Sequence, residues 1–342
     1  MKLLIIAQSV DKNNPVLGFF HEWIKEFAKK FESIVVICLE KGEYDLPSNV
    51  KVLSLGKEEG KSRLKYLYRF YRYIWAERKN YDTVFVHMNQ EYVLLGWKTW
   101  WLFRKPIYMW RNHQSGSFLT DLAAFSCKKV FCTSRFSYTA KYKKTVLMPV
   151  GIDTQIFNNQ HPIPRKKNSI LFLGRIARIK KPDLLIDVLA NIKDLPWTLT
   201  IVGNPRSEDM DYYQSLKKKT LDSGVNSRVS FQKGALNTET PAIYAAHEIF
   251  VNLSPSGLYD KTIFEAMATG CLVLTSNENL RGKINDNLFF KEGDNAELQK
   301  KLRGLLQYFD ADILKIRPEL RSLAKEHDLN TLSQKLYNEL SK

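Results

Sequence analysis

The sequence predicts an α/β protein with two doubly wound domains that follow one another along the chain. Short apolar runs typical of buried parallel strands alternate with segments whose apolar residues recur at helical spacing. The alternation stops in a polar, proline-containing segment that runs to Lys167, and it restarts at Ser169. A length of 342 residues also fits two domains better than one. We therefore expect domains at residues 1–155 and 156–328, followed by a final helix at 329–342.

The individual elements are predicted from apolar runs and their spacing. Strands are expected at residues 3–7, 33–39, 82–87, 107–110 and 129–133 of the first domain, and at 169–173, 198–202, 229–231, 249–253 and 271–275 of the second. Helices are expected at residues 19–31, 61–81, 92–103, 134–142, 182–192, 212–223, 241–246, 261–269 and 330–340. Strand, helix and strand in this order form the right-handed βαβ units of parallel sheets.

Composition indicates a globular protein rather than a membrane-spanning one. The apolar fraction is 44%, and no run approaches the roughly 18 apolar residues of a membrane-spanning helix. The N-terminal apolar run soon meets Asp11 and Lys12, so we interpret it as a strand and not as a signal peptide. The four cysteines have no CxxC spacing and lie in apolar stretches. They are expected to be buried thiols of a cytoplasmic protein.

The net charge of +16 favours an anionic partner, which can be nucleic acid, an acidic membrane surface or a phosphorylated small molecule. The predicted helix at 61–81 is dense in both aromatic and cationic residues. Its expected core stripe is Leu64, Leu67, Tyr71, Ile74 and Trp75, and Lys65, Arg69 and Arg72 lie off that stripe near Tyr66, Tyr68 and Tyr73. This face suits the headgroup region of an acidic membrane. The alternative is a solvated cationic face on a core helix.

The stretch 252–270 has the clearest functional pattern. A loop of small residues, 254–257, joins the strand at 249–253 to a helix that begins near Lys261 and ends at Gly270. Such a loop lies at the carboxyl edge of a parallel sheet, where open α/β sheets bind ligands. The first amides of the helix would face an anion placed there. We therefore expect an anion site at this helix.

Other strand ends carry groups that can complete the site. Arg175 and Lys180 share the loop after the strand at 169–173, where they form either a diphosphate clamp or merely a basic loop. Glu265, on the first turn of the helix, either caps amides or accepts hydroxyls from a ribose. His87 and His113 both end strands of the first domain, and His113 is the better candidate because its loop is polar and contains glycine.

Several familiar signals are absent. The loop before the helix at 19–31 lacks GxGxxG, so it does not indicate a dinucleotide. No metal-ligand spacing stands out, and neither a Ser/His/Asp nor a Cys/His order can be defended. We expect no metal, no cofactor and no protein nucleophile.

An ordered set of motifs resembles the retaining glycosyltransferases of family 4 (glycosyl transferases group 1). The motifs are Gly174-Arg175 with Lys180, Val202-Gly203-Asn204, Val229 with Phe231 and Gly234, Ser254-Pro255-Ser256, and Phe264 to Gly270. Gly18, His87 and residues 150–154 match the family too, so the resemblance covers essentially the whole chain.

The resemblance implies a GT-B fold, in which two Rossmann-like domains face one another across a cleft. The N-terminal domain would bind the acceptor, and the final helix would pack back on it. The C-terminal domain would hold a nucleotide sugar, with Arg175 and Lys180 on the diphosphate, Glu265 on the ribose and His113 near the sugar. The remaining donor-binding residues implied are Gly18, Gly203, Lys233, Gly234, Asp260, Lys261 and Thr262.

The implied activity is that of a hexosyltransferase-type enzyme (EC 2.4) that moves a sugar from a nucleotide sugar to a glycan or lipid-linked acceptor. It would act in cell-surface polysaccharide or glycolipid synthesis, in the cytoplasm or on the inner face of the membrane, without nucleic acid. One departure is Gly257, which stands where the family usually has the first of two glutamates, eight positions before Glu265. The alternatives are another GT-B enzyme, such as an epimerase or phosphorylase, and a basic protein that binds anionic polymers.

Overall fold

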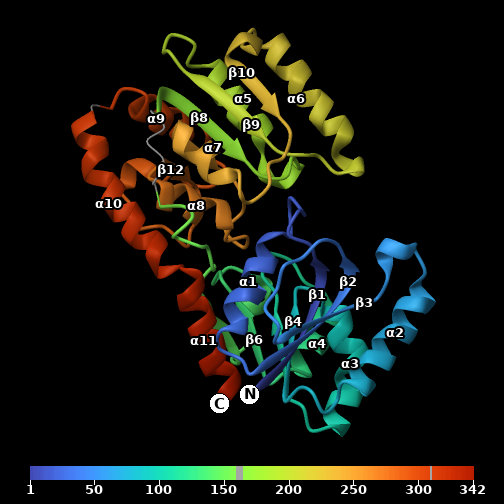
Figure 1. Cartoon of the computed structure of the whole chain (residues 1–342). Coiled ribbons are helices and arrows are strands. Elements are labelled where there is room, and N and C mark those ends of the chain that lie inside the picture. Colours follow the sequence, from blue (N-terminus) through green and yellow to red (C-terminus); the bar gives the residue numbers. More distant parts are fainter. Residues whose placement is uncertain (159–164, 309) are drawn as a thin grey trace. The chain divides into compact units, whose positions relative to one another are not determined.

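The computed structural model describes residues 1–158, 165–308 and 310–342, and Figure 1 shows the chain as a ribbon. The chain divides into two compact α/β units. The N-terminal unit consists of Met1–Gly151 and Leu329–Lys342, and the C-terminal unit is Ile152–Asp328. The boundary between the two units therefore lies after Gly151, whereas the sequence predicted it after residue 155. Part of the expected linker, residues 159–164, lies outside the described residues.

The N-terminal unit is built on a seven-stranded parallel sheet in the order β3-β2-β1-β4-β5-β6-β7. The bounds are β1 Lys2–Val10, β2 Ser33–Lys41, β3 Val50–Ser54, β4 Thr83–His87, β5 Ile107–Trp110, β6 Lys129–Cys132 and β7 Thr145–Leu147. The five strands predicted here are confirmed. The two edge strands, β3 and β7, were not predicted because they are only partly buried and lack a continuous apolar run.

Helices cover both faces of this sheet. Their bounds are α1 Phe19–Ala28, α2 Arg63–Ala76, α3 Gln90–Leu102, α4 Phe118–Phe125 and α11 Leu329–Ser341. Leu3 and Ile5 of β1 belong to a core shared with α1 and α11. Leu4 and Ile6 point to the other face and join a core shared with α2, α3 and α4. The helix predicted at 134–142 is only a short 3-10 helix, and α4 was not predicted.

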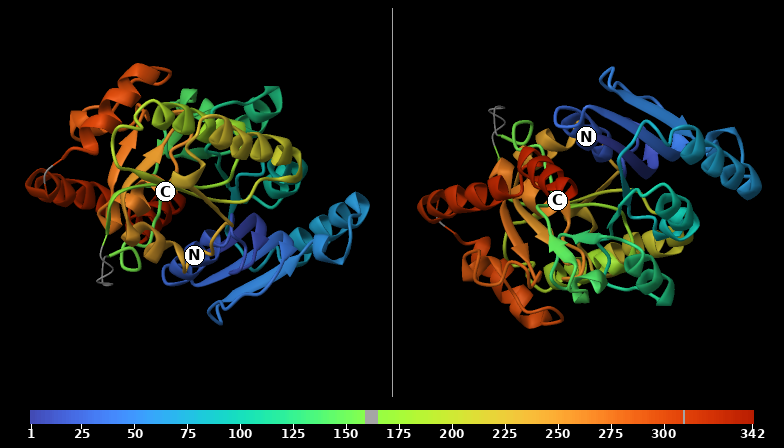
Figure 2. Two further views of the ribbon diagram at one scale, coloured as in Figure 1. Left: turned by 90° about the horizontal axis from the view of Figure 1, so that it is seen from above. Right: turned by 90° about the horizontal axis from the view of Figure 1, so that it is seen from below.

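The expected core stripe of α2 is wrong. Phe70 and Ile74 are the residues of α2 that are fully buried against the sheet. Of the five stripe residues only Ile74 is buried, whereas Leu64 is 81% and Trp75 54% exposed. Helix α2 carries apolar side chains around most of its circumference, so periodicity alone does not identify the buried face. The helix contacts β2, and both views of Figure 2 show it, in light blue, projecting from the N-terminal unit.

The C-terminal unit contains a five-stranded parallel sheet in the order β10-β9-β8-β11-β12. The strands are β8 Lys166–Leu173, β9 Thr198–Val202, β10 Val229–Gln232, β11 His247–Asn252 and β12 Leu272–Thr275. The helices are α5 Pro182–Ala190, α6 Met210–Asp222, α7 Thr240–Ala246, α8 Lys261–Thr269, α9 Asn295–Leu305 and α10 Asp310–Glu326. All five strands predicted here are confirmed, whereas α9 and α10 were not predicted.

Short 3-10 helices occupy several loops of both units. They are η1 Lys57–Glu59, η2 Tyr138–Lys141, η3 Arg178–Lys180, η4 Ser207–Asp209, η5 Asn226–Arg228 and η6 Asp286–Leu288.

The four cysteines are buried and unpaired, as predicted. Burial raises the pKa of Cys38 and Cys127 to about 12, so both remain thiols at neutral pH. Among the helices described, none combines the length and apolarity needed to cross a bilayer.

Candidate functional site

The loops after β8, β9 and β10 lie together at the carboxyl edge of the C-terminal sheet. The backbone amide of Ile176 donates to the carbonyl oxygen of Asn204 at 3.2 Å, and that of Gly203 donates to the carbonyl oxygen of Gln232 at 3.1 Å. The amide of Gly234 donates to Asn204 Oδ1 at 3.0 Å. Three loops that are far apart in sequence therefore form one connected rim.

Gly203 is required by the close approach of two of these loops. A Cβ at this position would lie 1.9 Å from the carbonyl oxygen of Gly174, far inside any permitted contact. Gly174 itself has φ +153°, a value that favours glycine. The predicted Gly203 therefore has a packing reason to be glycine, whether or not it also approaches a ligand.

Arg175 follows Gly174 and has carboxylates in its neighbourhood, those of Asp209, Glu208 and Asp260, but none at ion-pair distance. Within the described part of the chain it forms no ion pair, and its Nε is buried without a hydrogen-bond partner. Burial lowers the pKa of its guanidinium, and Arg206 nearby lowers it further, although the group stays charged. A partly buried guanidinium with an unused donor is suited to bind a phosphate or carboxylate.

Lys180, in contrast, is held by a network at the start of α8. Its Nζ lies 2.6 Å from Asp260 Oδ2 and 3.1 Å from Ser254 Oγ. The hydroxyl of Ser254 and the amide of Asn252 also donate to Asp260 Oδ2, at 2.5 and 3.0 Å. Burial alone would raise the pKa of Asp260, but Lys180 and these two donors hold it below its usual value. The sequence predicted Lys180 as a phosphate ligand and did not anticipate this carboxylate partner.

Helix α8 starts immediately after this network. Asp260 is its N-cap residue, yet the Asp260 side chain does not cap the helix, because its carboxylate is directed to Lys180. The helix ends at Gly270, which has φ +85° in the left-handed region. Arg165 donates to the carbonyl oxygens of Thr269 and His247, so a cation stabilises the C-terminal end of α8.

Lys261 and Glu265 occupy successive turns of α8. Both side chains are partly buried, and burial lowers the pKa of Lys261 and raises that of Glu265, while each charge partly offsets the shift of the other. The hydroxyl of Tyr244 on α7 donates to Glu265 Oε2 at 3.0 Å and fixes the position of this carboxylate. Thr262 lies beside Lys261 on the first turn, and Lys233 is exposed in the loop after β10.

Two predicted residues belong to the N-terminal unit and are described separately. His113 follows β5, where its Nδ1 lies 3.1 Å from the backbone nitrogen and 3.0 Å from the hydroxyl of Ser115. Gly18 precedes α1, and a Cβ there would lie 2.6 Å from the carbonyl oxygen of Asn14. His87 is 6% exposed and stacks on Phe20 with ring centroids 4.2 Å apart, so it packs in the aromatic core.

The structure therefore gathers the predicted residues of the C-terminal unit around one sheet edge. These are Arg175, Lys180, Gly203, Lys233, Gly234, Asp260, Lys261, Thr262 and Glu265. The sequence did not predict that Asn252 would donate to Asp260 or that Tyr244 would donate to Glu265. Asn252 is the last residue of β11, a position at which a polar side chain would have indicated its role. Tyr244 carried no such signal.

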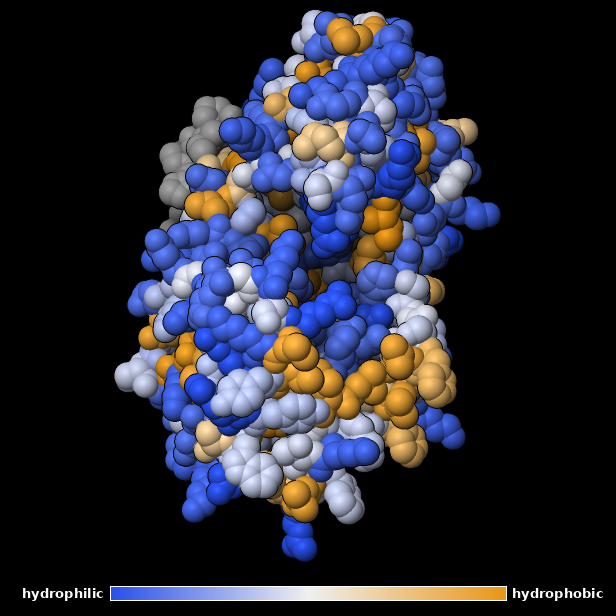
Figure 3. Space-filling model, turned by 90° about the vertical axis from the view of Figure 1, so that its right-hand side faces the viewer, coloured by the Kyte–Doolittle hydropathy of each residue, from blue (hydrophilic) through white to orange (hydrophobic). Residues whose placement is uncertain are grey.

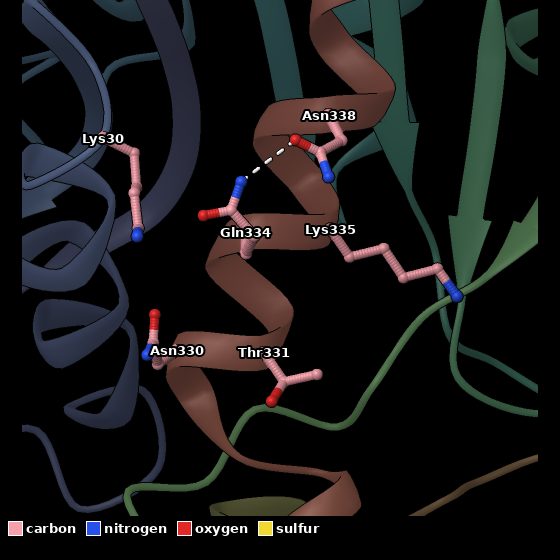
Figure 4. Close-up of a pocket in the computed structure, with 6 residues that line it drawn as sticks. All are labelled: Lys30, Asn330, Thr331, Gln334, Lys335 and Asn338. Atoms are coloured by element: carbon pink, nitrogen blue, oxygen red, sulfur yellow. Dashed lines mark hydrogen bonds between the residues drawn. The ribbon is translucent and has the colours of Figure 1, made fainter.

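A separate groove in the N-terminal unit has different chemistry. It has a volume of about 470 Å³ and lies beside the exposed side of α11, lined by Lys30, Asn330, Thr331, Gln334, Lys335 and Asn338. Figure 4 shows Gln334 hydrogen-bonded to Asn338 at 3.0 Å, while Lys335 points away and reaches the carbonyl oxygen of Leu147. None of the residues that the sequence predicts for the site lines this groove, so it is not considered further as the candidate site.

Comparison of the sequence with known families and proteins finds glycosyltransferases. The family described as Glycosyl transferases group 1 matches residues 167–308. A D-inositol 3-phosphate glycosyltransferase of Frankia alni is 27% identical over 153 residues, which are 41% of this chain and 38% of that protein. A mannosylfructose-phosphate synthase of Agrobacterium fabrum is 29% identical over 147 residues, or 32% of its length. The chain thus spans well under half the length of these two curated relatives.

The fold agrees with solved structures over the whole chain. Anabaena HepE, crystallised in complex with UDP and glucose, superposes with a TM-score of 0.80 at 18% identity and covers all of both chains. The predicted architecture of two parallel α/β units is therefore confirmed as GT-B type. The match to the glycosyl transferases group 1 family covers residues 167–308, which contain the sheet edge with Arg175 and Glu265.

Proposed function

We propose that this protein is a retaining glycosyltransferase of family 4 that transfers a sugar from a nucleotide-sugar donor. The donor would bind the C-terminal unit at the rim formed by the loops after β8, β9 and β10 and the N-terminus of α8. The acceptor, a glycan or a lipid-linked sugar, would bind the N-terminal unit. Such an enzyme fits the synthesis of a cell-surface polysaccharide or glycolipid at the cytoplasmic side of the membrane.

The proposal rests on the burial and the hydrogen bonding of the Arg175 guanidinium. This guanidinium is partly buried, forms no ion pair with the carboxylates near it among the described residues and keeps one buried N–H without an acceptor. Buried polar groups are normally satisfied, so an unused donor on a cation indicates a missing anionic ligand. A diphosphate supplies both the charge and the acceptor oxygens.

The other groups have separate roles in this proposal. The N-terminus of α8, where the Asp260 side chain makes no capping hydrogen bond, would add the positive end of the helix dipole to the phosphate site. Glu265, positioned by Tyr244, would accept hydroxyls of the ribose. The backbone at Lys233 and Gly234 would line the base pocket, and His113 would lie near the donor sugar. Support also comes from HepE, whose crystal structure contains UDP and glucose.

Transfer with retention needs neither a metal nor a protein nucleophile in this scheme. The acceptor hydroxyl attacks the anomeric carbon on the face that the diphosphate leaves, and a phosphate oxygen takes the proton. Arg175, Lys180 and the amides of α8 would stabilise the charge that develops on the leaving diphosphate. Within the described residues no group of three His, Cys, Asp or Glu side chains is arranged to hold a metal ion.

The first prediction tests the phosphate site. We expect UDP or another nucleoside diphosphate, found by a thermal-shift screen, to raise the melting temperature of the wild-type protein. The variant Arg175→Ala should lose this shift and lower transfer about a hundredfold, since it removes a charge-assisted contact worth about 3 kcal/mol in the transition state.

The control is Arg178→Ala in the same loop. Arg178 is exposed and its guanidinium lies 4.8 Å from the ring centre of Tyr212, so it has a partner of its own. This variant should keep both the thermal shift and the transfer rate. Equal losses in the two variants would mean that the loop as a whole, rather than Arg175, determines binding. Normal transfer by Arg175→Ala would rule out the phosphate site.

A further inference from the structure

The outer faces of α2, α3 and α4 are unusually apolar for a surface. The described residues include twenty large apolar side chains that are exposed, and twelve of them lie on these three helices. They are Leu64, Leu67, Tyr68, Tyr71 and Trp75 on α2, Leu95, Trp101 and Leu102 on α3, and Phe118, Leu119, Leu122 and Phe125 on α4. We call these twelve residues the apolar belt. Single exposed apolar residues need no explanation, but a gathering of this kind marks an interaction surface.

The belt is exposed to a degree that packing within the chain does not account for. Trp101 and Phe118 are each 76% exposed, and Phe125 is 81% exposed. Figure 3 shows apolar side chains gathered on the N-terminal unit, in the lower half of the view. The inner faces of the same helices already supply the core of the sheet through Phe70, Trp100 and Ala123. The belt is therefore a second apolar face, additional to the one that folding uses.

The three helices are neighbours, so the belt extends over adjoining elements. The hydroxyl of Tyr71 on α2 donates to the carbonyl oxygen of Leu95 on α3 at 2.9 Å. The rings of Trp75 and Phe103 meet edge to face, with centroids 5.1 Å apart. Helix α4 in turn packs against α3.

Unpaired cations accompany the belt. Arg63, Arg72, Lys79, Lys98, Arg104 and Lys128 are all exposed, and in the part of the chain that the structure describes none of them forms an ion pair. Two lie over aromatic rings: the Arg72 guanidinium is 5.2 Å from the ring centre of Tyr73, and Lys98 Nζ is 5.6 Å from that of Trp97. Between residues 63 and 125 there are ten lysines and arginines but only four carboxylates.

The cations emphasised from the sequence contribute less. Lys65 and Arg69 both bind Glu59, at 2.5 and 2.9 Å, so this one carboxylate offsets half of their combined charge. The membrane hypothesis for α2 therefore keeps Arg72 and Tyr68 but depends less on Lys65 and Arg69 than the sequence suggested. It now rests on exposed aromatic and aliphatic side chains that extend to α3 and α4, with cations around them.

The belt also contains hollows large enough for an acyl chain. One on the outer side of α2 has a volume of about 660 Å³ and is lined by Leu64, Leu67, Tyr68, Tyr71, Arg72 and Trp75. Another, of about 560 Å³, lies between α2 and α3, where Leu67 and Leu95 of the belt meet Leu39, Phe70 and Tyr92. Both hollows have mostly apolar linings.

We propose that the apolar belt is the surface by which this protein docks on an anionic phospholipid bilayer. Aromatic and aliphatic side chains would enter the headgroup and upper acyl region, and the six exposed cations would meet anionic headgroups. A second copy of the chain is a poorer occupant, because a two-fold interface would bring the same unpaired cations together. This docking does not depend on which sugar is transferred, so it can be tested separately from the activity.

The test is sedimentation with vesicles. Wild-type protein should bind vesicles of equal parts phosphatidylcholine and phosphatidylglycerol, and bind pure phosphatidylcholine vesicles at least about tenfold less. The double variant Trp101→Ser with Phe125→Ser should weaken binding to the mixed vesicles about tenfold, because both side chains are exposed and contribute apolar contact without supporting the core. The double variant Arg72→Ala with Lys98→Ala should show a similar loss.

Matched controls lie in the C-terminal unit. The double variant Leu221→Ser with Leu314→Ser removes leucines that are 62% and 66% exposed, and Lys218→Ala with Lys300→Ala removes two exposed cations. Both controls should bind the mixed vesicles like the wild type. Equal binding by all variants would overturn the proposal. So would an absence of vesicle binding together with a dimer, seen by sedimentation velocity, that Trp101→Ser with Phe125→Ser dissociates.

Discussion

Arg175 and Lys180 were expected to act as a pair, but the structure gives them different surroundings. Arg175 has no carboxylate partner among the described residues, whereas Lys180 is bound to Asp260 within a network that includes Ser254 and Asn252. The Lys180–Asp260 pair is mostly buried, with side chains 18% and 19% exposed. Lys180 therefore helps to hold the β11–α8 loop in place, in addition to any role towards a phosphate.

The pH dependence of stability gives a prediction for this pair. Burial alone would raise the pKa of Asp260, but the Lys180 ammonium and two neutral donors hold this pKa below its ordinary value of 3.8. A carboxyl whose folded pKa is depressed stabilises the fold above its unfolded pKa, and this contribution is lost as the pH falls towards the folded value. The variant Asp260→Asn should lower the free energy of unfolding by roughly 3 kcal/mol at neutral pH. The difference from wild type should shrink below about pH 4.

Urea unfolding at a series of pH values measures this difference. Asp187→Asn is the control, since Asp187 is half-exposed and pairs with Lys219 on the surface. That variant should change stability little at any pH, because exposed ion pairs contribute little. A destabilisation by Asp260→Asn that stays constant across the acid range would show that the carboxylate acts through packing rather than charge.

At the scale of elements, α11 belongs to the N-terminal unit although it is the last helix of the chain. Its residues Leu332 and Leu336 are fully buried in the core that α1 shares with the sheet. Gly151, where the chain leaves this unit, has φ +75°, and a Cβ there would lie 2.3 Å from Leu332 Cδ2. Trp23 donates its ring N–H to the carbonyl oxygen of Gly151 at 2.9 Å. The end of the first segment and the returning helix thus pack on the same tryptophan.

This packing predicts a large effect of Leu332→Ala. The variant should lower the free energy of unfolding by about 2–5 kcal/mol, because it leaves a cavity in a fully buried cluster. Gln334→Ala is the control on the same helix, since Gln334 lines the exposed groove of Figure 4. It should change stability by less than about 0.5 kcal/mol. Similar values for the two variants in urea unfolding would mean that α11 is not an integral part of this core.

Helix α2 shows the limit of prediction at this scale. Its start was close to the prediction, although it ends at Ala76 rather than at residue 81. Its buried face was not predicted, because Leu64, Tyr71 and Trp75 are as apolar as the residues that face the sheet. Helical spacing identifies which residues share a face. It does not decide which of two apolar faces meets the sheet and which remains outside.

For the whole molecule, the proposed reaction predicts the product and the ion requirement. We consider a reaction with an acceptor and a sugar nucleotide that raises the melting temperature of the protein. Its product should keep the anomeric configuration of the donor, as seen by NMR of the glycosidic proton. EDTA should leave the rate unchanged, since Arg175 and the amides of α8 would stabilise the leaving diphosphate in place of a metal. Inversion would contradict a retaining enzyme. Conversion of the sugar nucleotide without any acceptor would instead indicate an epimerase.

The sequence by itself determined the two α/β units, most of the parallel strands and the sheet edge that carries the candidate site. Apolar runs identify buried strands, and the chain order of βαβ units places polar strand ends at one edge. Only the tertiary structure decided which charges are paired there: among the described residues Lys180 pairs with Asp260, whereas Arg175 forms no ion pair. It also decided that the apolar belt faces outward. Both depend on contacts between residues far apart in the chain, which local periodicity and spacing do not contain.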